Sequence, residues 1–575
     1  MKKVSDIIAE CLKKNNVKHI FGYQGGSITH LIESFDSVGI NYIQTYNEQG
    51  AAMAADAYGR ISENRLGVAI ASNGPGATNL ITGIANAYCD SVPTLFITGQ
   101  VHTWAMKKNE KLRQESFQEI DIISMVKPIT KYAKTIINPI EVVYEINKAI
   151  EIAKQGRPGP VLIDIPVDVQ GMIIDEEQLS LWQGIKNNEV DIEEDVICEV
   201  IDIINKSKQP ICLVGGGVSE CQAKDYLRKL IEEQSLPTVC SLQGLDVINH
   251  ENEAFIGYIG SYGNRYANIA LQNSDCILVL GSRLDKRQTG KNVSAFAPKA
   301  TIIHVEIDDS EIGHIFQDEK GIKCDVNKFI EKLFLHRESL NIDKDWLNTI
   351  SGWKKYLGES QPANEIIKAV SNNINDKCIC TFDVGQNQMW AAQSLRIAGR
   401  DVRILNSGGL GAMGYSLPAS IGAYYADSEK DIYAFMGDGG IQMNIQELAV
   451  IGSNQLPVKI FVFNNKSLGL IREMHEKYYN NNCVGSVKGF SQPDFKMLAG
   501  AYGISYYEVK SVEDVIELRD KIRNNEPCLF DIVFNDNTYV RPELLGMDTL
   551  DKQSPYITED DWRSDDYVRK NGKIS

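Results

Sequence analysis

The strongest constraint on the fold of this 575-residue chain is a glycine-rich turn between two apolar runs. Residues 431–436 are mostly apolar and lead into the Gly-Asp-Gly-Gly turn at 437–440. A second apolar run covers 458–463, and Asn465 follows it, 27 residues after Asp438. Two buried strands joined by one helical crossover run parallel. The segment therefore predicts a β-loop-α-β unit, and both polar side chains are expected at one edge of a sheet, where ligands bind in α/β folds.

The residue types at this edge suit an anionic group and a hard cation. Asp438 and Asn465 offer oxygen ligands of the kind that Mg²⁺ prefers. The three glycines of the turn let backbone N–H groups approach a phosphate. A strand-to-helix turn with a surface aspartate is the competing interpretation. The amide placed after the next strand favours a metal and phosphate site, and we expect the helix between the strands to cover 444–452.

The chain alternates strand-like and helical segments throughout, which is typical of α/β layers with parallel sheets. Its length predicts three or four domains. Polar stretches at 175–195 and 341–364 separate three blocks, and in the first block we expect helices over 48–58 and 77–88. The expected units are three doubly wound parallel-sheet domains at 1–170, 190–340 (Rossmann-like) and 365–547, followed by a polar C-terminal tail at 548–575.

Composition excludes several classes of partner. The chain has 59 Lys and Arg against 76 Asp and Glu, a net charge of −17, which argues against nucleic acid or an anionic membrane as the main partner. Its 12 cysteines are scattered and contain no CxxC pair, so we expect small buried side chains in a reducing compartment rather than disulfides or zinc ligands. We find no signal peptide and no apolar run of about 18 residues, and therefore expect a cytoplasmic protein without membrane spans.

Six further segments occur in a recognisable order with the glycine-rich turn. They are residues 21–26, 47–52, 73–79, 156–160, 383–390 and 407–414. Together with Gly-Asp-Gly and Asn-Asn they resemble the thiamine diphosphate (ThDP, also called thiamine pyrophosphate) enzymes. Over nearly the whole chain the resemblance is to the large, catalytic subunits of the acetolactate synthase group. It implies three α/β domains, in which the first binds the aminopyrimidine of ThDP, the central one often carries FAD, and the last binds the diphosphate.

The resemblance implies the roles of the catalytic residues. Glu48 would supply the carboxyl group that protonates the pyrimidine ring of ThDP, and the small residues at 50–55 would let the cofactor pack closely. An exposed glutamate at a helix N-terminus is the alternative for Glu48. Phe117 and Gln118 would face the substrate carboxylate and the reacting carbon, although Phe117 alone would more often be a core residue.

The same resemblance implies the cofactor contacts. Met413 would support the bent shape of ThDP, although a lone methionine is more often a core residue. Asp438, Asn465 and Ser467 would hold Mg²⁺. The remaining implied ThDP contacts are Pro75, Asn79, Gly385, Gln386, Asn387 (where the family more often has His), Gly411, Gly437, Gly439, Gly440 and Gly469.

The central block resembles the FAD site of the family. Gly215-Gly216-Gly217 follows a strand, and Gly216, Arg157 and Arg287 would contact the flavin nucleotide. Asp308 comes after a later strand, where a carboxylate could meet the ribose or adenine. Glycine-rich turns also occur in Rossmann-like domains without a cofactor, and the family match favours FAD.

Four positions depart from the family pattern and concern the acceptor. Met474 stands where a substrate-selecting tryptophan is usual, Val167 where lysine is usual, Gln24 where proline is usual, and Asn47 where histidine is usual. These changes leave cofactor activation intact. They open and neutralise the acceptor side, so a larger or less anionic acceptor becomes plausible.

Several reactions fit these features. The first is carboligation, in which pyruvate or a close 2-oxo acid loses CO₂ and its two-carbon unit joins a second carbonyl, as in acetolactate formation. The second is transfer to a nucleotide-linked keto sugar, which the departures favour. The basic run Lys107, Lys108, Lys111 and Arg113 also favours it, although that run fits a solvated loop as well.

Two further hypotheses concern the function, and the resemblance also carries an expectation about the oligomeric state. A flavin-dependent pyruvate oxidase is the third hypothesis. A non-catalytic cofactor-binding subunit is the fourth, and the presence of Glu48 argues against it. The resemblance implies a homodimer or homotetramer, with Glu48 of one subunit facing Asp438 of the partner subunit.

Overall fold

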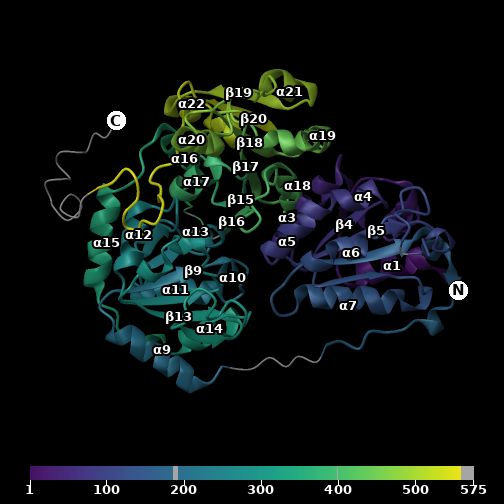
Figure 1. Ribbon diagram of the computed structural model, residues 1–575, viewed down its shortest axis with the longest axis horizontal. Coiled ribbons are helices and arrows are strands. Elements are labelled where there is room, and N and C mark those ends of the chain that lie inside the picture. Colours follow the sequence, from purple (N-terminus) through teal and green to yellow (C-terminus); the bar gives the residue numbers. More distant parts are fainter. Residues whose placement is uncertain (110, 186–191, 398, 400, 558–575) are drawn as a thin grey trace.

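The computed structural model describes residues 1–109, 111–185, 192–397, 399 and 401–557. Three lobes are visible, each with a sheet flanked by helices (Figure 1). Each of the three large sheets has six strands, and all neighbouring strands within them are parallel. This confirms the predicted fold class of three parallel-sheet α/β domains. No helix in the described ranges combines the length and the apolar character that crossing a bilayer requires.

The first sheet has the order β3-β2-β4-β5-β7-β6. Its inner strands are buried on both faces, which explains why they are continuous apolar runs rather than alternating ones. A short antiparallel pair, β1 (Lys2–Lys3) and β8 (Ile173–Ile174), ties the N-terminus to the end of this lobe. The main elements are β2 (His19–Gly22), β3 (Asn41–Gln44), β4 (Gly67–Ala71), β5 (Thr94–Gln100), β6 (Tyr132–Thr135), β7 (Val161–Pro166), α1 (Val4–Lys14), α2 (Thr29–Ser37), α3 (Glu48–Ile61), α5 (Ile81–Cys89) and α7 (Val142–Lys154).

The central sheet has the order β11-β10-β9-β12-β13-β14. Its middle strands β9 and β12 are apolar and fully buried. The main elements are β9 (Pro210–Val214), β10 (Thr238–Cys240), β11 (Phe255–Tyr258), β12 (Cys276–Leu280), β13 (Thr301–Glu306), β14 (Lys320–Lys323), α9 (Glu194–Lys206), α11 (Lys224–Gln234), α12 (Arg265–Asn273) and α14 (Val326–Leu335).

The third sheet has the order β16-β15-β17-β18-β20-β19. Strands β15, β17 and β18 are neighbours and parallel, so their carboxyl ends lie side by side. The main elements are β15 (Lys377–Phe382), β16 (Asp401–Asn406), β17 (Asp431–Gly437), β18 (Val458–Asn464), β19 (Ser505–Val509), β20 (Cys528–Val533), α16 (Pro362–Ser371), α17 (Gln386–Ser394), α18 (Ser416–Ala426), α20 (Gly469–Tyr478) and α21 (Phe495–Ala501).

Helices α3 and α18 join the first and third lobes at the centre of the molecule (Figure 1). Glycine and alanine at the contact let the two backbones approach closely, since a Cβ on Gly422 would lie 2.0 Å from the carbonyl oxygen of Ala54. The Tyr415 hydroxyl donates to the buried Asp56 carboxylate at 2.7 Å, and Arg60 pairs with the same carboxylate at 2.8 Å. The polar network fixes the rotation of one helix against the other.

Three expected segments differ from the structure. The helix predicted over 77–88 is divided at Leu80 into α4 (Pro75–Asn79) and α5. The helix predicted over 444–452 begins as a 3₁₀ segment, η9 (Ile441–Glu447), in which Asn444 leaves helical geometry, and continues as α19 (Leu448–Ser453). The polar stretch 341–364 contains α15 (Lys344–Tyr356), which packs against α12 of the central lobe because Trp346, Leu347 and Ile350 form an apolar face.

The described part of the tail, up to residue 557, packs against the body of the protein. Leu550 and Gln553 are buried, and Arg265 donates to the backbone carbonyls of Gln553 and Pro555 at 2.9 and 2.8 Å. The rest of the predicted tail lies outside the described residues. All twelve cysteines are described, none is paired, and nine are buried, as their apolar surroundings in the sequence predict.

Candidate active site

The carboxyl edge of the third sheet collects most of the predicted metal and diphosphate residues. Gln386 and Asn387 begin α17 directly after β15. Asp438 follows β17, and Asn465 follows β18. Because the three strands are adjacent and parallel, these four side chains share one edge, as the strand-end argument predicts.

Asp438 is buried and has one oxygen that accepts no hydrogen bond. Its Oδ1 accepts the backbone N–H of Gly439 at 2.9 Å, whereas Oδ2 has no partner. Burial raises the pKa of Asp438 to about 7, against hydrogen bonds from the backbone N–H groups of Gly439, Lys466 and Ser467 that lower it. A buried, unpartnered carboxylate oxygen is costly, and a hard cation such as Mg²⁺ would satisfy it. The residues present therefore fit the metal.

The amide oxygen of Asn465 faces Ser467, two residues further along the chain. Its Oδ1 accepts the backbone N–H and the hydroxyl of Ser467, both at 3.2 Å. The Ser467 hydroxyl also accepts from the buried Arg472 at 3.1 Å. Both oxygens therefore already take part in hydrogen bonds within the protein, and the assignments of Asn465 and Ser467 as metal ligands stay predictions.

Two glycines of the turn, Gly439 and Gly440, lie so close to neighbouring side chains that an added Cβ would displace them. A Cβ on Gly440 would lie 2.4 Å from Asp383 Oδ2, and one on Gly439 would lie 2.5 Å from Leu468 Cδ2. The same holds for Gly469, where a Cβ would lie 2.1 Å from Gln386 Oε1. These positions leave backbone rather than side chains facing the edge, as a phosphate-binding cradle needs.

The loop that carries Met413 reaches the same edge. Gly411 and Gly414 have positive φ angles of +72° and +84°, which favour glycine. The Gly414 N–H donates to Asp383 at 2.8 Å, and burial raises the pKa of that carboxyl to about 7. A Cβ on Gly439 would lie 3.6 Å from Met413 Cε. Met413 therefore lies over the glycine-rich turn, and Asp383, which the sequence argument did not single out, fixes its loop.

Glu48 lies at the carboxyl edge of the first sheet, as the first residue of α3. The Asn47 side chain caps this helix by accepting the N–H of Gln49 at 2.8 Å. Glu48 is buried, and its Oε2 accepts from Asn79 Nδ2 at 3.0 Å. A Cβ on Gly76 would lie 3.1 Å from Glu48 Oε1. The carboxyl group is therefore oriented by α4, which begins at the exposed Pro75 and ends at Asn79.

Gln118 lies on the loop after β5 and packs against the segment that leads into α4. It has a positive φ of +61°, and its carbonyl accepts from Asn73 Nδ2 at 3.1 Å. A Cβ on Gly74 would lie 2.9 Å from the Gln118 Cβ. Its neighbour Phe117 is 86% exposed, so Phe117 is not a core residue within a single subunit.

Within one subunit, no hydrogen bond or ion pair links Glu48 or Gln118 to Asp438 or Asn465 among the described residues. The third lobe instead contacts the N-terminus of α3 through Glu447. The Tyr46 N–H donates to Glu447 Oε1 at 3.1 Å. The two halves of the predicted ThDP site are thus built on separate sheet edges. Glu447 was missed by sequence reasoning because its only signal is one acidic residue in an apolar segment.

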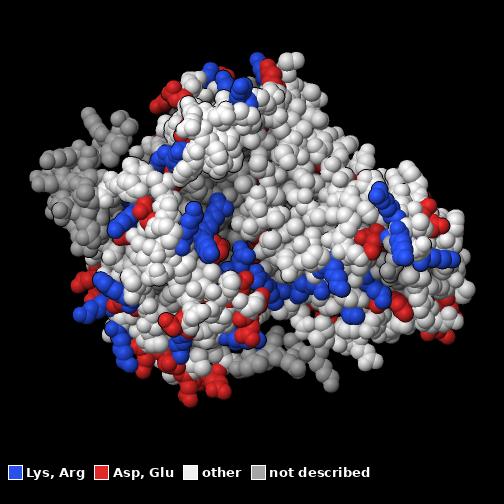
Figure 2. Space-filling model, in the orientation of Figure 1, with Lys and Arg blue, Asp and Glu red and all other residues white. Residues whose placement is uncertain are grey.

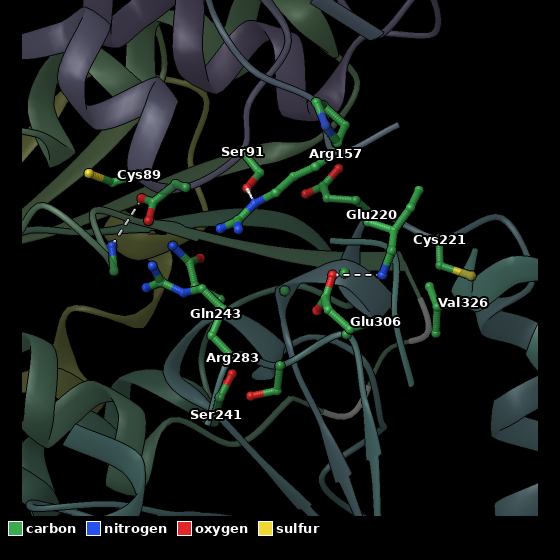
Figure 3. Close-up of a pocket in the computed structure, with 18 of the residues that line it drawn as sticks. Cys89, Ser91, Arg157, Glu220, Cys221, Ser241, Gln243, Arg283, Glu306 and Val326 are labelled. Carbon is green, nitrogen blue, oxygen red and sulfur yellow. Dashed lines mark hydrogen bonds between the residues drawn. The ribbon is translucent and has the colours of Figure 1, made fainter. Parts of the chain in front are cut away.

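A cavity of about 470 Å³ lies between the first and central lobes (Figure 3). Arg157, Gly216 and Arg287 line it, as predicted. Asp308 is not among its lining residues and pairs with Arg157 at 2.9 Å, so its contact with a flavin nucleotide stays a prediction. Glu306, the last residue of β13, lines the cavity in its place because it still lies on the strand edge.

The walls of this cavity carry charges of both signs, and the carboxylate residues in its lining are Glu63, Asp90, Glu220, Asp285, Glu306 and Asp325. Lys and Arg side chains gather where the two lobes meet (Figure 2), and those lining the cavity are Arg65, Lys154, Arg157, Arg283 and Arg287. A Cβ on Gly215 would lie 2.2 Å from the carbonyl oxygen of Gly281, so the turn needs glycine there. The volume is within the usual range for cofactor pockets.

Comparison with known proteins agrees with this geometry. Family models match residues 2–125 (thiamine pyrophosphate enzyme, N-terminal TPP binding domain), 197–333 (central domain) and 383–532 (C-terminal TPP binding domain). The large subunit of acetolactate synthase isozyme 2 from Escherichia coli (strain K12) is 33% identical over 543 residues, 93% of this chain and 96% of that protein. The acetolactate synthase large subunit of Cyanidium caldarium is 36% identical over 561 residues, 92% and 93% of the two chains. The probable acetolactate synthase large subunit of Methanocaldococcus jannaschii is 36% identical over 554 residues, 93% and 92%. The chain therefore belongs to the thiamine pyrophosphate enzymes, in the family of the acetolactate synthase large subunits.

Proposed function

We propose that the protein is a ThDP- and Mg²⁺-dependent carboligase that decarboxylates pyruvate or a close 2-oxo acid and joins the two-carbon unit to a second carbonyl, with acetolactate as the first product to seek. The observation that carries this proposal is the combination of an oriented, buried Glu48 with a buried Asp438 oxygen that has no hydrogen-bond partner among the described residues. One group suits proton exchange with a cofactor, and the other suits a hard cation.

The chemistry divides between cofactor and protein. When bound, ThDP supplies an electron sink for the carbon that loses CO₂. Asn79 holds one carboxyl oxygen of Glu48 and leaves Oε1 to hold or release a proton. Asp438 and Asn465 would hold Mg²⁺ on the diphosphate, while the glycine turn offers backbone N–H groups to it.

The proposal includes a homodimer or homotetramer, in which Glu48 of one subunit faces Asp438 of the partner subunit. The apolar side chains of Tyr46, Leu410 and Met443 are 47%, 41% and 53% exposed and lie near the two sheet edges, as expected for surfaces that a second subunit covers. The test mixes two inactive variants, Glu48→Gln and Asp438→Asn. Random mixing should restore about a quarter of wild-type activity, because half of the dimers then contain one intact site. No recovery after subunit exchange would contradict a shared site.

FAD is proposed for the cavity between the first and central lobes. The five Lys and Arg side chains of its mixed-charge lining and the Gly215 turn support it. The purified protein should be yellow, with flavin absorbance that denaturation releases. A colourless protein that does not take up added FAD would refute this part. We also propose that the protein works in the cytoplasm.

The reaction itself is tested with ¹³C-pyruvate, ThDP and Mg²⁺, and products are identified by NMR. Acetolactate formed without any other acceptor supports the first function. Release of CO₂ only when another carbonyl compound is added would contradict it.

A second acceptor class is favoured by the loop after β5. Lys107 is half-buried, while Lys108, Lys111 and Arg113 are exposed, and in the described part of the chain none of the four forms an ion pair. The loop is held from inside, because Glu119 accepts the backbone N–H of Lys107 at 2.5 Å and that of Glu115 at 2.8 Å. The four cations therefore belong to the same loop as Gln118, and hydrogen bonds to Glu119 hold the backbone of that loop in place. These cations would suit an acceptor with a phosphate group, such as a nucleotide-linked keto sugar.

Two of the positions that depart from the family pattern, Met474 and Val167, have surroundings that agree with a larger acceptor. Met474 is 39% exposed on α20, and Val167 begins the short helix α8 (Val167–Gly171). Charge reversal of Lys107 and Lys108 should raise the KM for the phosphorylated acceptor and leave that for pyruvate unchanged. The double reversal of Lys13 and Lys14, exposed on α1, is the matched control. An unchanged acceptor KM would exclude this role of the loop.

A further inference from the structure

Thr538 forms a closed hydrogen-bond circuit with the two amide side chains of the third sheet edge. Asn465 Nδ2 donates to Gln386 Oε1 and to Thr538 Oγ1, each at 2.8 Å. The Thr538 hydroxyl donates to Gln386 Oε1 at 2.8 Å, and Gln386 Nε2 donates to the Thr538 carbonyl at 2.9 Å. Thr538 is 73 residues beyond Asn465 in the chain.

The circuit determines which way each amide faces. An amide nitrogen only donates and an amide oxygen only accepts, whereas a hydroxyl does both. Gln386 cannot turn over, because its Nε2 is committed to the Thr538 carbonyl. Gln386 Oε1 therefore faces Asn465. If the Asn465 amide were rotated by half a turn, its oxygen would face Gln386 Oε1, and two hydrogen-bond acceptors would oppose each other. The Asn465 oxygen must therefore face away, towards Ser467.

That direction is the one the predicted metal site requires. Asn465 Oδ1 accepts the Ser467 N–H, and the backbone N–H groups of Lys466 and Ser467 lie close enough to the Asp438 carboxyl to lower its pKa. Both oxygen groups are therefore turned to the backbone of residues 466–467. Asp438 Oδ2 there remains without a partner.

Thr538 is itself held in place by neighbouring side chains. Arg472, a buried residue, donates to the Thr538 carbonyl. Trp390 Nε1 donates to the carbonyl of Tyr539 at 3.0 Å. The guanidinium groups of Arg472 and Arg541 lie 5.2 and 5.1 Å from the centre of the Tyr539 ring. These contacts explain how a residue outside any helix or strand can have a fixed hydroxyl.

We propose that Thr538 is a positioning residue: its carbonyl fixes the Gln386 amide, and its hydroxyl, together with Gln386 Oε1, holds the Asn465 nitrogen so that the Asn465 oxygen is presented to the metal beside Asp438. The inference rests on the proposed Mg²⁺ site. Groups that orient metal ligands typically change metal affinity by about 10- to 100-fold when removed. Thr538 is thus a further determinant of Mg²⁺ affinity, and it lies far from the glycine-rich turn in the sequence but close to the metal site in space.

The test compares Thr538→Val, which keeps the shape and loses the hydroxyl, with Thr538→Ser, which restores it. Mg²⁺ binding to the full-length enzyme is measured by calorimetry at saturating ThDP. Thr538→Val should bind Mg²⁺ about tenfold more weakly or worse, and Thr538→Ser should bind within about twofold of wild type. The Mg²⁺ concentration for half-maximal activity should rise in parallel, while kcat at saturating Mg²⁺ changes little. Thr349→Val is the control, because it also removes a hydrogen-bonded hydroxyl, which donates to the Asp345 carbonyl within α15.

The outcomes separate this inference from the proposed site. If wild type binds Mg²⁺, Asp438→Asn does not, and Thr538→Val binds like wild type, the positioning role is wrong while the metal site stands. If wild type and Asp438→Asn behave alike, the metal site fails and the inference fails with it. Should Thr538→Val not fold, Thr538→Ala removes the same hydroxyl without adding a methyl group in its place and is judged by the same criterion.

Discussion

The backbone N–H of Tyr46 donates to the Glu447 carboxylate at 3.1 Å, although the two residues are 401 positions apart in the chain. The contact is tight, because a Cβ on Gly50 would lie 2.5 Å from Glu447 Oε1. Glu447 is fully buried. A carboxyl group of the third lobe thus holds the helix start that carries Glu48.

Glu447 should make the stability of the protein depend on pH. Burial raises its pKa from 4.5 to about 7. Between these values the folded state keeps a proton that the unfolded state has released. The free energy of unfolding therefore falls as pH rises through this window, by about 3 kcal/mol for this group. Its contribution is fully present below pH 4.5 and lost above pH 7.

Glu447→Gln cannot ionise and should flatten this decline. The measurement is urea unfolding of both proteins across the window. Glu429→Gln, at an exposed position, should follow wild type. The same decline in wild type and in Glu447→Gln would show that Glu447 does not titrate there.

Gly422→Ala should separate α3 from α18. The added Cβ would lie 2.0 Å from a backbone oxygen of Ala54, and no side-chain rotation can relieve that contact. We expect a loss of about 3 kcal/mol in the free energy of unfolding. Gly352→Ala in α15 meets nothing within 4 Å and should stabilise by up to about 1 kcal/mol. Equal effects at both sites would argue against close packing of the two helices.

Glu48→Gln should slow proton exchange strongly while cofactor binding remains. We expect exchange of the thiazolium C2 proton of bound ThDP, followed by NMR in D₂O, to slow by about 10²- to 10⁴-fold. ThDP affinity should change only a few-fold, because Asn79 can still bind the amide oxygen. Glu33→Gln, exposed on α2, is the control. Exchange at the wild-type rate would remove Glu48 from its proposed role.

Arg287→Glu should reduce flavin content. Arg287 lines the cavity, whereas its neighbour Lys286 does not. Reversing the charge next to an anionic nucleotide should weaken binding by about ten- to a hundredfold, seen as loss of flavin absorbance in the purified protein. Lys286→Glu makes the same charge change and should stay yellow. If both variants keep their flavin, Arg287 does not contact it.

Much of the candidate metal and diphosphate site could be predicted from the polar residues that directly follow the strands. Asp438 and Asn465 follow two apolar runs one crossover apart, and parallel pairing of β17 and β18 brings them together. The glycines at 437, 439 and 440 were assigned for the same local reason. Asp308 pairs with Arg157 and does not line the cavity, because which residue after β13 faces the cavity depends on how the chain turns beyond the strand.

The sequence by itself determined the three parallel-sheet domains and which strand ends carry carboxylates and amides, because apolar runs, glycine turns and crossover lengths are local properties. Only the tertiary structure decided how those groups are oriented. Thr538 reaches Asn465 across 73 residues, and Glu447 reaches Tyr46 across 401. Such hydrogen bonds need donors and acceptors from distant elements within about 3 Å, and only the packing of the lobes and of the loop after β20 brings them there.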